Sequence, residues 1–236
     1  MWARILSCLL TITLIAGVAA ARERPPIKTV GVISDVGDKV RLQHIGFTVF
    51  TNFVAESDFP DWTLDAFITA EIETALKARY ELHPVTFAKG SIAPDLKPRL
   101  FHDPNPEDNV RANARPADGQ PLDAYVVVWP STRGVIPTNQ FVQGVGLLTR
   151  SSYAWIYAVV RVSLIDGNTF EEIDTCLLKV PGRTTDDNEM REARDLYVEK
   201  SLDEMTPDQR KRFEDGVKGL LHDGLAYCLT DVKLLP

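Results

Sequence analysis

Histidine and cysteine are scarce in this chain, which contains four histidines and three cysteines among 236 residues. The histidines lie at positions 44, 83, 102 and 222, without the HExxH spacing of a zinc site and without paired cysteines nearby. The sequence therefore predicts no metal site, and each histidine is expected at the surface or at a strand edge. The best candidate for a catalytic role is His102, because Asp103 follows it in an irregular segment.

The glycine patterns of common catalytic and cofactor sites are also missing. No nucleophile-elbow glycines surround the serines at positions 131, 151 and 152. Gly144 and Gly146 do not complete a dinucleotide-binding fingerprint. We therefore predict no catalytic residue and no cofactor.

Positive charge is in deficit, with 26 basic residues against 33 acidic ones and a formal net charge of −7. Nucleic acids and anionic lipid surfaces both require clustered Lys or Arg, so neither is expected as a partner. The acidic run TTDDNE at 184–189 lacks the alternating ligands and the glycine of an EF-hand calcium loop. We favour its simpler role at a helix start, where acidic side chains complement the helix dipole.

Long hydrophobic segments are limited to the amino terminus. Arg4 is followed by an apolar run at 5–18 and by three alanines at 19–21, which is the arrangement of a secretory signal peptide. The run is shorter than the roughly 20 residues of a membrane-spanning helix. We expect residues 1–21 to be cleaved near Ala21, which leaves a soluble periplasmic or secreted protein. Cys8 lies inside the run, so a lipoprotein signal is not indicated. An uncleaved amino-terminal membrane anchor is the alternative.

Removal of the signal peptide also removes Cys8 and leaves Cys176 and Cys228. An even pair in an oxidising compartment favours a disulfide, which would join the last helical segment to a strand. The alternative is a pair of buried free thiols that pack as small hydrophobic side chains. We favour the disulfide slightly.

The most regular pattern in the chain lies between Tyr153 and Val180, and it predicts a long β-hairpin. Apolar residues alternate along the first strand and share one face, which must be buried. These residues are Ala154, Ile156, Ala158, Val160, Val162 and Leu164. The turn is supplied by Asp166, Gly167 and Asn168.

Tyr153, Trp155 and Tyr157 form an aromatic stripe on the other face of this strand. Large aromatic side chains with polar groups are common at protein interfaces, so the stripe is the candidate binding site. The alternative is a second core in which other elements cover the stripe. This alternative is favoured if the 123–129 segment is a central strand, because such a sheet needs cover on both faces.

The remaining strands are predicted at 27–34, 39–53, 81–87 and 123–129, and the segment 143–150 leads into the long hairpin. The 39–53 segment is either a hairpin folded at Gly46 or one long strand with a bulge. The continuously apolar DAYVVVWP sequence indicates a central strand. The segment at 90–121 contains six prolines and is expected to be irregular, and 131–140 is expected to be a loop.

Helical periodicity predicts a first helix at 61–80 with Asp61 as its N-cap. Helical patterns return at 186–204 and after Thr206, where Pro207 and Gln209 complete a helix start. We therefore predict a single α/β domain over 27–236, with a mixed and largely antiparallel sheet. Residues 27–180 would form the sheet core, and two carboxyl-terminal helices would lie within 186–230.

Three of these segments together resemble the α/β periplasmic domains of the TolB amino-terminal and curli-secretion-lipoprotein kind. They are the helix and strand at 64–87, the DAYVVVWP strand, and the hairpin at 153–173 with its IDGNTFEEI turn. The similarity covers 27–180. The chain resembles exported bacterial proteins of unassigned function even more. It implies an envelope interaction module without catalysis. The chain departs from those families because it has no lipid-anchoring cysteine, no propeller and no long amphipathic pore segment.

Our leading functional hypothesis is a soluble exported protein that binds another envelope or secreted protein and is not an enzyme. It predicts no nucleic-acid partner and no stable membrane insertion after signal cleavage. A first alternative is a hydrolase-like enzyme whose site lies where the 90–121 segment meets the carboxyl end of the Asp123 strand. A second alternative is a small-ligand carrier, which requires a pocket.

Overall fold

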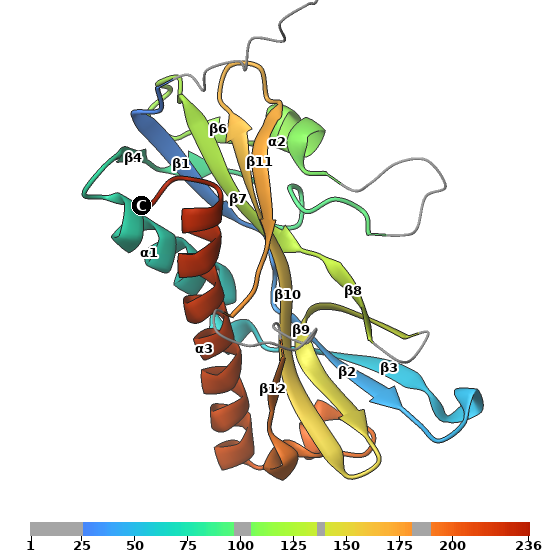
Figure 1. Cartoon of the computed structure of the whole chain (residues 1–236). Coiled ribbons are helices and arrows are strands. Elements are labelled where there is room, and N and C mark those ends of the chain that lie inside the picture. The colour runs from blue at the N-terminus through green and yellow to red at the C-terminus, as the bar shows by residue number, and fades with distance from the viewer. Residues whose placement is uncertain (1–25, 97–104, 136–139, 181–189) are drawn as a thin grey trace, which may run out of the picture.

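The computed structural model of the chain describes residues 26–96, 105–135, 140–180 and 190–236 (Figure 1). The expected signal peptide at 1–21, the pair His102 and Asp103, and the acidic run at 184–189 lie outside the described residues. Within the described part, no helix is both long enough and apolar enough to cross a membrane.

In the described residues one large sheet of ten strands forms the body, and seven of its strands follow the order β3-β2-β9-β10-β7-β1-β4. The strands on this path are β1 Thr29–Ser34, β2 Lys39–Ile45, β3 Phe53–Asp58, β4 Glu81–His83, β7 Ala124–Pro130, β9 Gln140–Arg150 and β10 Tyr153–Asp166. Attached beside it are β8 Thr132–Val135, β11 Glu172–Leu177 and β12 Met190–Glu192. The short strands β5 Val85–Thr86 and β6 Arg115–Pro116 pair separately.

Pairing in the sheet is mixed. β1 runs parallel to β4 and β7, and β2 runs parallel to β9, whereas the other pairs of the sheet are antiparallel. The predicted fold class, an α/β fold with a mixed and largely antiparallel sheet, is confirmed. Figure 1 shows the long strand β10 running through the middle of the sheet, with β7 beside its upper half and β9 beside its lower half.

β10 and β11 form the predicted hairpin. All six apolar residues of its predicted inward face are buried, because they lie under the helices of the main core. The Asp166 carboxylate accepts hydrogen bonds from the backbone N–H groups of Asn168 and Thr169, which fixes the turn. β7 is buried over Ala124–Trp129, as expected for a central strand.

Two long helices cover one face of the sheet. The helix α1 Leu64–Leu76 and the helix α3 Pro207–Asp231 lie side by side there, and α3 packs along β10 (Figure 1). α1 buries Leu64, Ile68, Ile72 and Leu76, a spacing of four residues that keeps them on one face. The short helix α2 Glu107–Asn113 belongs to a smaller core with Tyr125, Val127 and Trp129, on the other face.

Several predicted boundaries differ from the structure. α1 begins at Leu64 instead of Asp61, because Pro60–Trp62 forms a 3-10 turn that buries Trp62. The 81–87 strand is divided into β4 and β5 at Pro84, which has no N–H group to continue a ladder. The 131–140 loop contains β8, which pairs antiparallel with β9. The 39–53 segment is the hairpin alternative, in which β2 and β3 are joined through Gly46 and a 3-10 turn.

The described carboxyl-terminal residues, 190–236, contain one long α-helix where two helices were expected within 186–230. Between 190 and 206 the structure has β12 and two 3-10 turns, at Arg194–Leu196 and Leu202–Glu204. The reason is tertiary: β12 pairs with β10, so its backbone is satisfied by the sheet and not by a helix. Met190, Leu196 and Leu202 in this segment are nevertheless buried.

The expected disulfide is present between Cys176 in β11 and Cys228 in α3, with their Cα atoms 5.5 Å apart. Both residues are buried in the main core. The bond therefore fixes the carboxyl-terminal helix covalently to the sheet that it covers.

Candidate functional site

The carboxyl end of β1 is organised by a buried carboxylate. Asp35 directly follows the strand, is 3% exposed, and accepts hydrogen bonds from three backbone N–H groups. The donors are Gly90 at 2.7 Å, Ile92 at 2.8 Å and Ala93 at 2.8 Å. Asp35 therefore ties the segment after β5 to the end of β1, a position where α/β sheets commonly bind ligands.

A second carboxylate, Asp65 in the first turn of α1, fixes the connection between β1 and β2. It accepts hydrogen bonds from the Ser34 hydroxyl at 2.8 Å and from the Val36 N–H at 2.8 Å, and Gly37 N–H donates to its other oxygen at 3.2 Å. Burial raises the pKa of Asp65, the hydrogen bonds oppose this shift, and the charge of Asp35 adds to it. Both carboxylates thus have structural partners.

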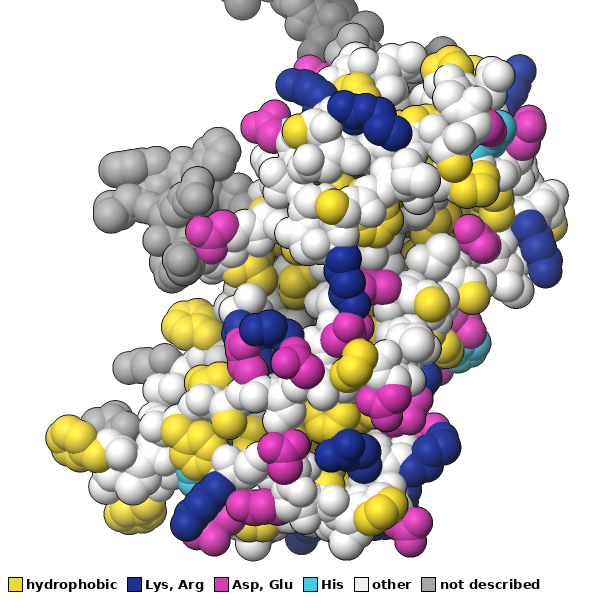
Figure 2. Space-filling view, turned by 180° about the vertical axis from the view of Figure 1, so that it is seen from behind, with side chains coloured by type: hydrophobic (Ala, Val, Ile, Leu, Met, Phe, Trp, Pro, Cys, Tyr) yellow, Lys and Arg dark blue, Asp and Glu magenta, His cyan; other side chains and the backbone are white. Residues whose placement is uncertain are grey.

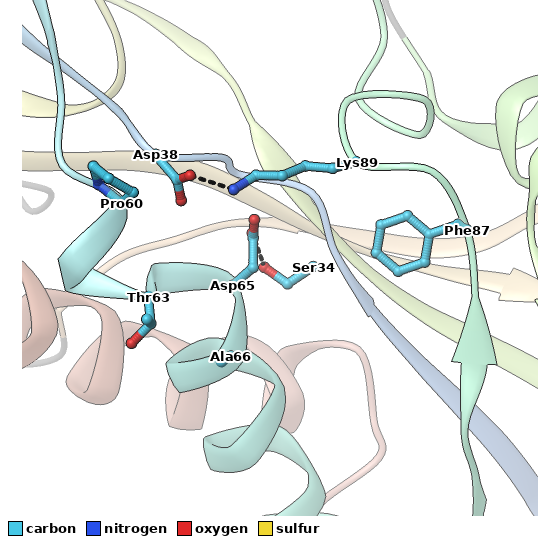
Figure 3. Close-up of a pocket in the computed structure, with 8 residues that line it drawn as sticks. All are labelled: Ser34, Asp38, Pro60, Thr63, Asp65, Ala66, Phe87 and Lys89. Carbon is cyan, nitrogen blue, oxygen red and sulfur yellow. Dashed lines mark hydrogen bonds and ion pairs between the residues drawn. The ribbon is translucent and has the colours of Figure 1, made fainter.

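A cavity of about 340 Å³ lies between these segments (Figure 3). It is lined by Ser34, Asp38, Pro60, Thr63, Asp65, Ala66, Phe87 and Lys89. The Lys89 side chain extends across it to an ion pair with Asp38, and the Phe87 ring stands at one side. The hydrogen bond to Asp38 raises the pKa of Lys89. The lining carries two carboxyl groups and one ammonium group, so it suits a small ligand with a positive charge better than an anion.

A second cavity, of about 460 Å³, lies at the carboxyl end of β7, where the enzyme alternative was predicted. Its lining residues are Leu96, Asn105, Trp129, Ser131, Thr132, Arg161, Glu172 and Thr175. Burial raises the pKa of Glu172, while hydrogen bonds with Ser163 and Thr175 and the charge of Arg161 lower it. The Trp129 ring is 2% exposed, and its Nε1 donates to the Ser163 hydroxyl. Among these described lining residues there is no histidine or cysteine, and the catalytic candidates His102 and Asp103 lie outside the described chain.

The structure separates the three residues of the predicted aromatic stripe. Tyr153 is 39% exposed and Trp155 is half-buried, but Tyr157 is completely buried. Burial raises the pKa of the Tyr157 phenol, and its hydroxyl has no hydrogen-bond partner in the described structure. Tyr157 therefore belongs to the core, as the second-core alternative expected, and only Tyr153 and Trp155 can take part in a surface.

Tyr153 and Trp155 are stacked with ring centroids 5.7 Å apart and an interplanar angle of 12°. The Arg194 guanidinium lies over the Tyr153 ring, with its central carbon 4.1 Å from the centroid. Arg194 is paired with Glu192 of β12, the strand that runs beside Trp155. We call Arg194, Tyr153 and Trp155 the aromatic stack. Sequence reasoning missed Arg194, because the contact depends on β12, which was expected to be helical.

Two fully exposed phenylalanines were also missed. Phe47 and Phe50 are 105% and 94% exposed in the connection between β2 and β3. Figure 1 shows this hairpin extending away from the body, and Figure 2 shows hydrophobic side chains projecting at the corresponding end. One sequence signal was available: the stretch QHIGFTVFTNFVA at 43–55 has no Asp, Glu, Lys or Arg, although 25% of the chain is charged.

The histidines in the described part make ordinary polar contacts. His83 Nδ1 is 2.6 Å from Asp118, which raises the pKa of His83, and His222 Nδ1 is 2.7 Å from Glu71. His44 Nδ1 is 2.9 Å from the Thr149 hydroxyl. Over the same residues, no cluster of three or more histidine, cysteine, aspartate or glutamate side chains could hold a metal ion.

Comparison with known proteins gives no family assignment. No protein-family model matches the chain, and no curated protein matches it. Among solved structures, a hypothetical protein of Chlamydia trachomatis is 15% identical, with 86% of this chain and 99% of that chain covered and a TM-score of 0.29. A lipoprotein of Neisseria meningitidis is 11% identical, with 64% and 81% covered and a TM-score of 0.24. TM-scores this low do not establish a shared fold, and the resemblance to TolB and curli-secretion domains stays a prediction.

Proposed function

We propose that the chain is an exported, non-catalytic binding protein that docks another envelope or secreted protein on the aromatic stack. The carrying observation is the contact of Arg194, Tyr153 and Trp155 at the end of β10 that is joined to β9. Tryptophan, tyrosine and arginine are the residue types that most often dominate the binding energy of protein interfaces. A partly exposed cluster of all three is therefore suited to anchor a partner.

The stack is also held in place before a partner arrives. Trp155 pairs with Leu148 of β9 on one side and with Glu192 of β12 on the other, so its backbone is fixed within the sheet. Arg194 is restrained by its ion pair with Glu192. Side chains that are already ordered lose less conformational entropy on binding, which leaves more of the contact energy for affinity.

Export is supported by the disulfide between Cys176 and Cys228, because disulfides persist mainly in oxidising compartments. The amino-terminal sequence supports the same proposal through its signal-peptide pattern. The acidic balance of the chain, with 33 acidic and 26 basic residues, disfavours nucleic acid as the partner.

The test is site-specific photocrosslinking in the producing cell. A photoreactive phenylalanine analogue at position 153 is expected to crosslink one defined protein, and the same analogue at Phe141 provides the control. Phe141 is 64% exposed but lies at the far end of β9 from the stack. With the partner identified, Arg194→Ala should weaken binding about 10-fold or more, by loss of a hot-spot contact. Equal crosslinking at both positions, or unchanged affinity in the variant, would contradict the proposal.

A second candidate function is carriage of a small organic cation in the cavity beside Lys89. It is favoured by the excess of carboxyl groups in the lining and by the Phe87 ring, which offers an apolar and π-electron surface. The cation would displace Lys89 from Asp38. Calorimetric titration with alkyl and aryl amines, and with neutral analogues of equal size, tests this. Binding of the amines should be lost in Asp38→Asn and kept in Asp61→Asn, whose side chain is exposed outside the lining.

A further inference from the structure

The connection between β2 and β3 exposes two large apolar side chains that no described part of the chain covers. Phe47 is 105% and Phe50 is 94% exposed, values that mean both rings stand clear of the surface. We call residues 46–52 the hairpin tip. In Figure 1 the tip is the outermost part of a hairpin that extends away from the sheet. Single exposed apolar residues are ordinary, but two fully exposed rings on one projecting tip indicate contact with another phase or molecule.

The tip carries no ionic charge. The stretch 43–55 contains no acidic residue, lysine or arginine. The first charged residues on either side, Arg41 and Glu56, form an ion pair with each other at 2.7 Å. A charged group is costly to bring into hydrocarbon, so this uncharged end can approach an apolar phase without that cost.

Part of the backbone of the tip forms hydrogen bonds within the tip itself. The Gly46 N–H donates to the Asn52 side-chain oxygen at 2.9 Å, and the Thr51 N–H donates to the Thr48 carbonyl at 3.0 Å. The Thr51 hydroxyl donates to the same carbonyl at 2.8 Å. Backbone polar groups that enter a bilayer must find partners within the protein, because no water is available there. These internal hydrogen bonds meet that requirement for the groups they join.

Residues suited to the polar boundary of a bilayer lie beside the tip. Ile45, the last residue of β2, pairs with Arg150, and Arg150 pairs with Tyr153 across the next hairpin. Arg150 and Tyr153 are both exposed. Tyrosine and arginine commonly lie at the level of lipid headgroups, while phenylalanine enters the apolar region below.

From this arrangement we infer that the hairpin tip is a peripheral membrane anchor, with Phe47 and Phe50 inserted shallowly into a zwitterionic phospholipid surface. A protein pocket for two phenylalanines would be framed by a polar rim with matched hydrogen bonds or charges. The tip offers few such groups, because the Thr51 hydroxyl and the Asn52 side-chain oxygen already form hydrogen bonds within the tip. A bilayer requires none. Zwitterionic lipid is the suitable surface because the acidic chain would be repelled by an anionic one.

The binding is reversible. Two inserted rings bury far less apolar surface than a membrane-spanning helix. The membrane affinity of the tip is therefore comparable to that of a single short acyl chain. Phe47 and Phe50 carry this inference, and only the boundary residue Tyr153 is shared with the aromatic stack. Membrane contact at the tip would hold the stack close to the bilayer, where a membrane-associated partner could reach it.

The experiment is flotation of the full chain with phosphatidylcholine vesicles. The double variant Phe47→Ser with Phe50→Ser is compared with wild type and with Phe141→Ser, which also loses one exposed phenylalanine but lies at the opposite end of β9. We expect the partition coefficient between vesicles and water to be at least ~10-fold lower for the double variant than for wild type. For the Phe141→Ser control it should equal that of wild type. All the proteins share the same amino terminus, so its apolar run contributes equally to each.

A second readout reports the depth of the tip itself. In a Phe50→Trp variant, lipids brominated in their acyl chains should quench additional tryptophan fluorescence relative to wild type, and 1 M salt should not abolish the quenching, because apolar insertion is not screened. Absence of this additional quenching would overturn the inference. So would binding that requires anionic lipid and disappears in salt. If the double variant loses a crosslinked protein partner while wild type fails to bind vesicles, the tip is a protein-docking site and the lipid assignment is wrong.

Discussion

At the scale of single residues, Gly146 in β9 shows how closely the sheet is packed around Tyr157. A Cβ atom at position 146 would lie 2.2 Å from the Arg41 carbonyl oxygen and 2.4 Å from the Tyr157 hydroxyl. Neither neighbour can move freely, because Arg41 pairs with Gly146 in the ladder and the Tyr157 ring is fully buried. The buried ring therefore depends on a glycine in the adjacent strand.

We predict that Gly146→Ala destabilises the protein by about 1–3 kcal/mol, the usual cost of overpacking a core. Urea denaturation followed by circular dichroism measures the change. Gly134→Ala is the matched control, because its Cβ would meet only a Phe141 ring atom at 3.8 Å. Comparable loss in both variants would mean that strand glycines are sensitive in general and that the contact with Tyr157 is not the cause.

A second residue-scale prediction concerns Asp123, which precedes β7. Its carboxylate accepts hydrogen bonds from the backbone N–H groups of Thr29 and Lys28 at 2.9 and 2.8 Å, and these bonds lower its pKa. A carboxyl group whose pKa is lowered by folding stabilises the protein at pH values above its pKa in the unfolded chain, about 3.9. That stabilisation is lost as the pH falls through the pKa of the folded state. Asp123→Asn should therefore cost about 1 kcal/mol at pH 7, by loss of charge-assisted bonds.

The control for Asp123 is the pH dependence itself. The protonated aspartic acid resembles asparagine in charge, so the difference in unfolding free energy between wild type and Asp123→Asn should shrink as the pH falls below the ordinary carboxyl range. Urea titrations at several pH values measure it. A difference that stays constant with pH would show that the side chain acts through its shape and not through its charge.

At the scale of elements, the sequence predicted those features that depend only on the local pattern of residues. The alternation along β10 fixes its buried face, the apolar run of β7 fixes its central position, and Thr206 with Gln209 fixes the start of α3. The tertiary partners of a segment are not visible in its own pattern. Residues 190–192 resemble part of a helix, but pairing with β10 makes them a strand, and this pairing brings Arg194 onto Tyr153. The cavity beside Lys89 likewise depends on segments far apart in the chain.

The start of α3 provides the element-scale prediction. Thr206 and Gln209 form a capping box in which each side chain bonds to the backbone of the other residue. Thr206→Ala should lower the free energy of unfolding by about 1 kcal/mol, because the Gln209 N–H loses the Thr206 hydroxyl as its acceptor. Thr74→Ala, within α1 and exposed, should have little effect or stabilise slightly, since alanine favours helix. Thermal denaturation distinguishes them, and equal destabilisation would contradict the capping role.

At the scale of the whole molecule, different regions are available for different contacts. The hairpin tip and the aromatic stack lie towards the same end of the sheet, since β2, β9 and β10 pair there. The cavity beside Lys89 lies at the carboxyl end of β1, among loops fixed by Asp35 and Asp65. In Figure 1, α3 runs along the sheet from one of these regions towards the other. Its attachment to the sheet therefore affects the stability of the whole fold.

The disulfide is the covalent part of that attachment, and it gives the last prediction. Cys176 and Cys228 are 52 positions apart, so their bond closes a long loop in the unfolded chain. By the chain-entropy estimate, such a loop stabilises the folded state by about 4 kcal/mol. The double variant Cys176→Ser with Cys228→Ser should therefore unfold at markedly lower urea concentration than wild type, and wild type treated with a reductant should follow the variant. If the reductant lowers the stability of the double variant as much as that of wild type, the effect does not come from this bond. If wild type and variant unfold together without reductant, packing alone holds α3 on the sheet.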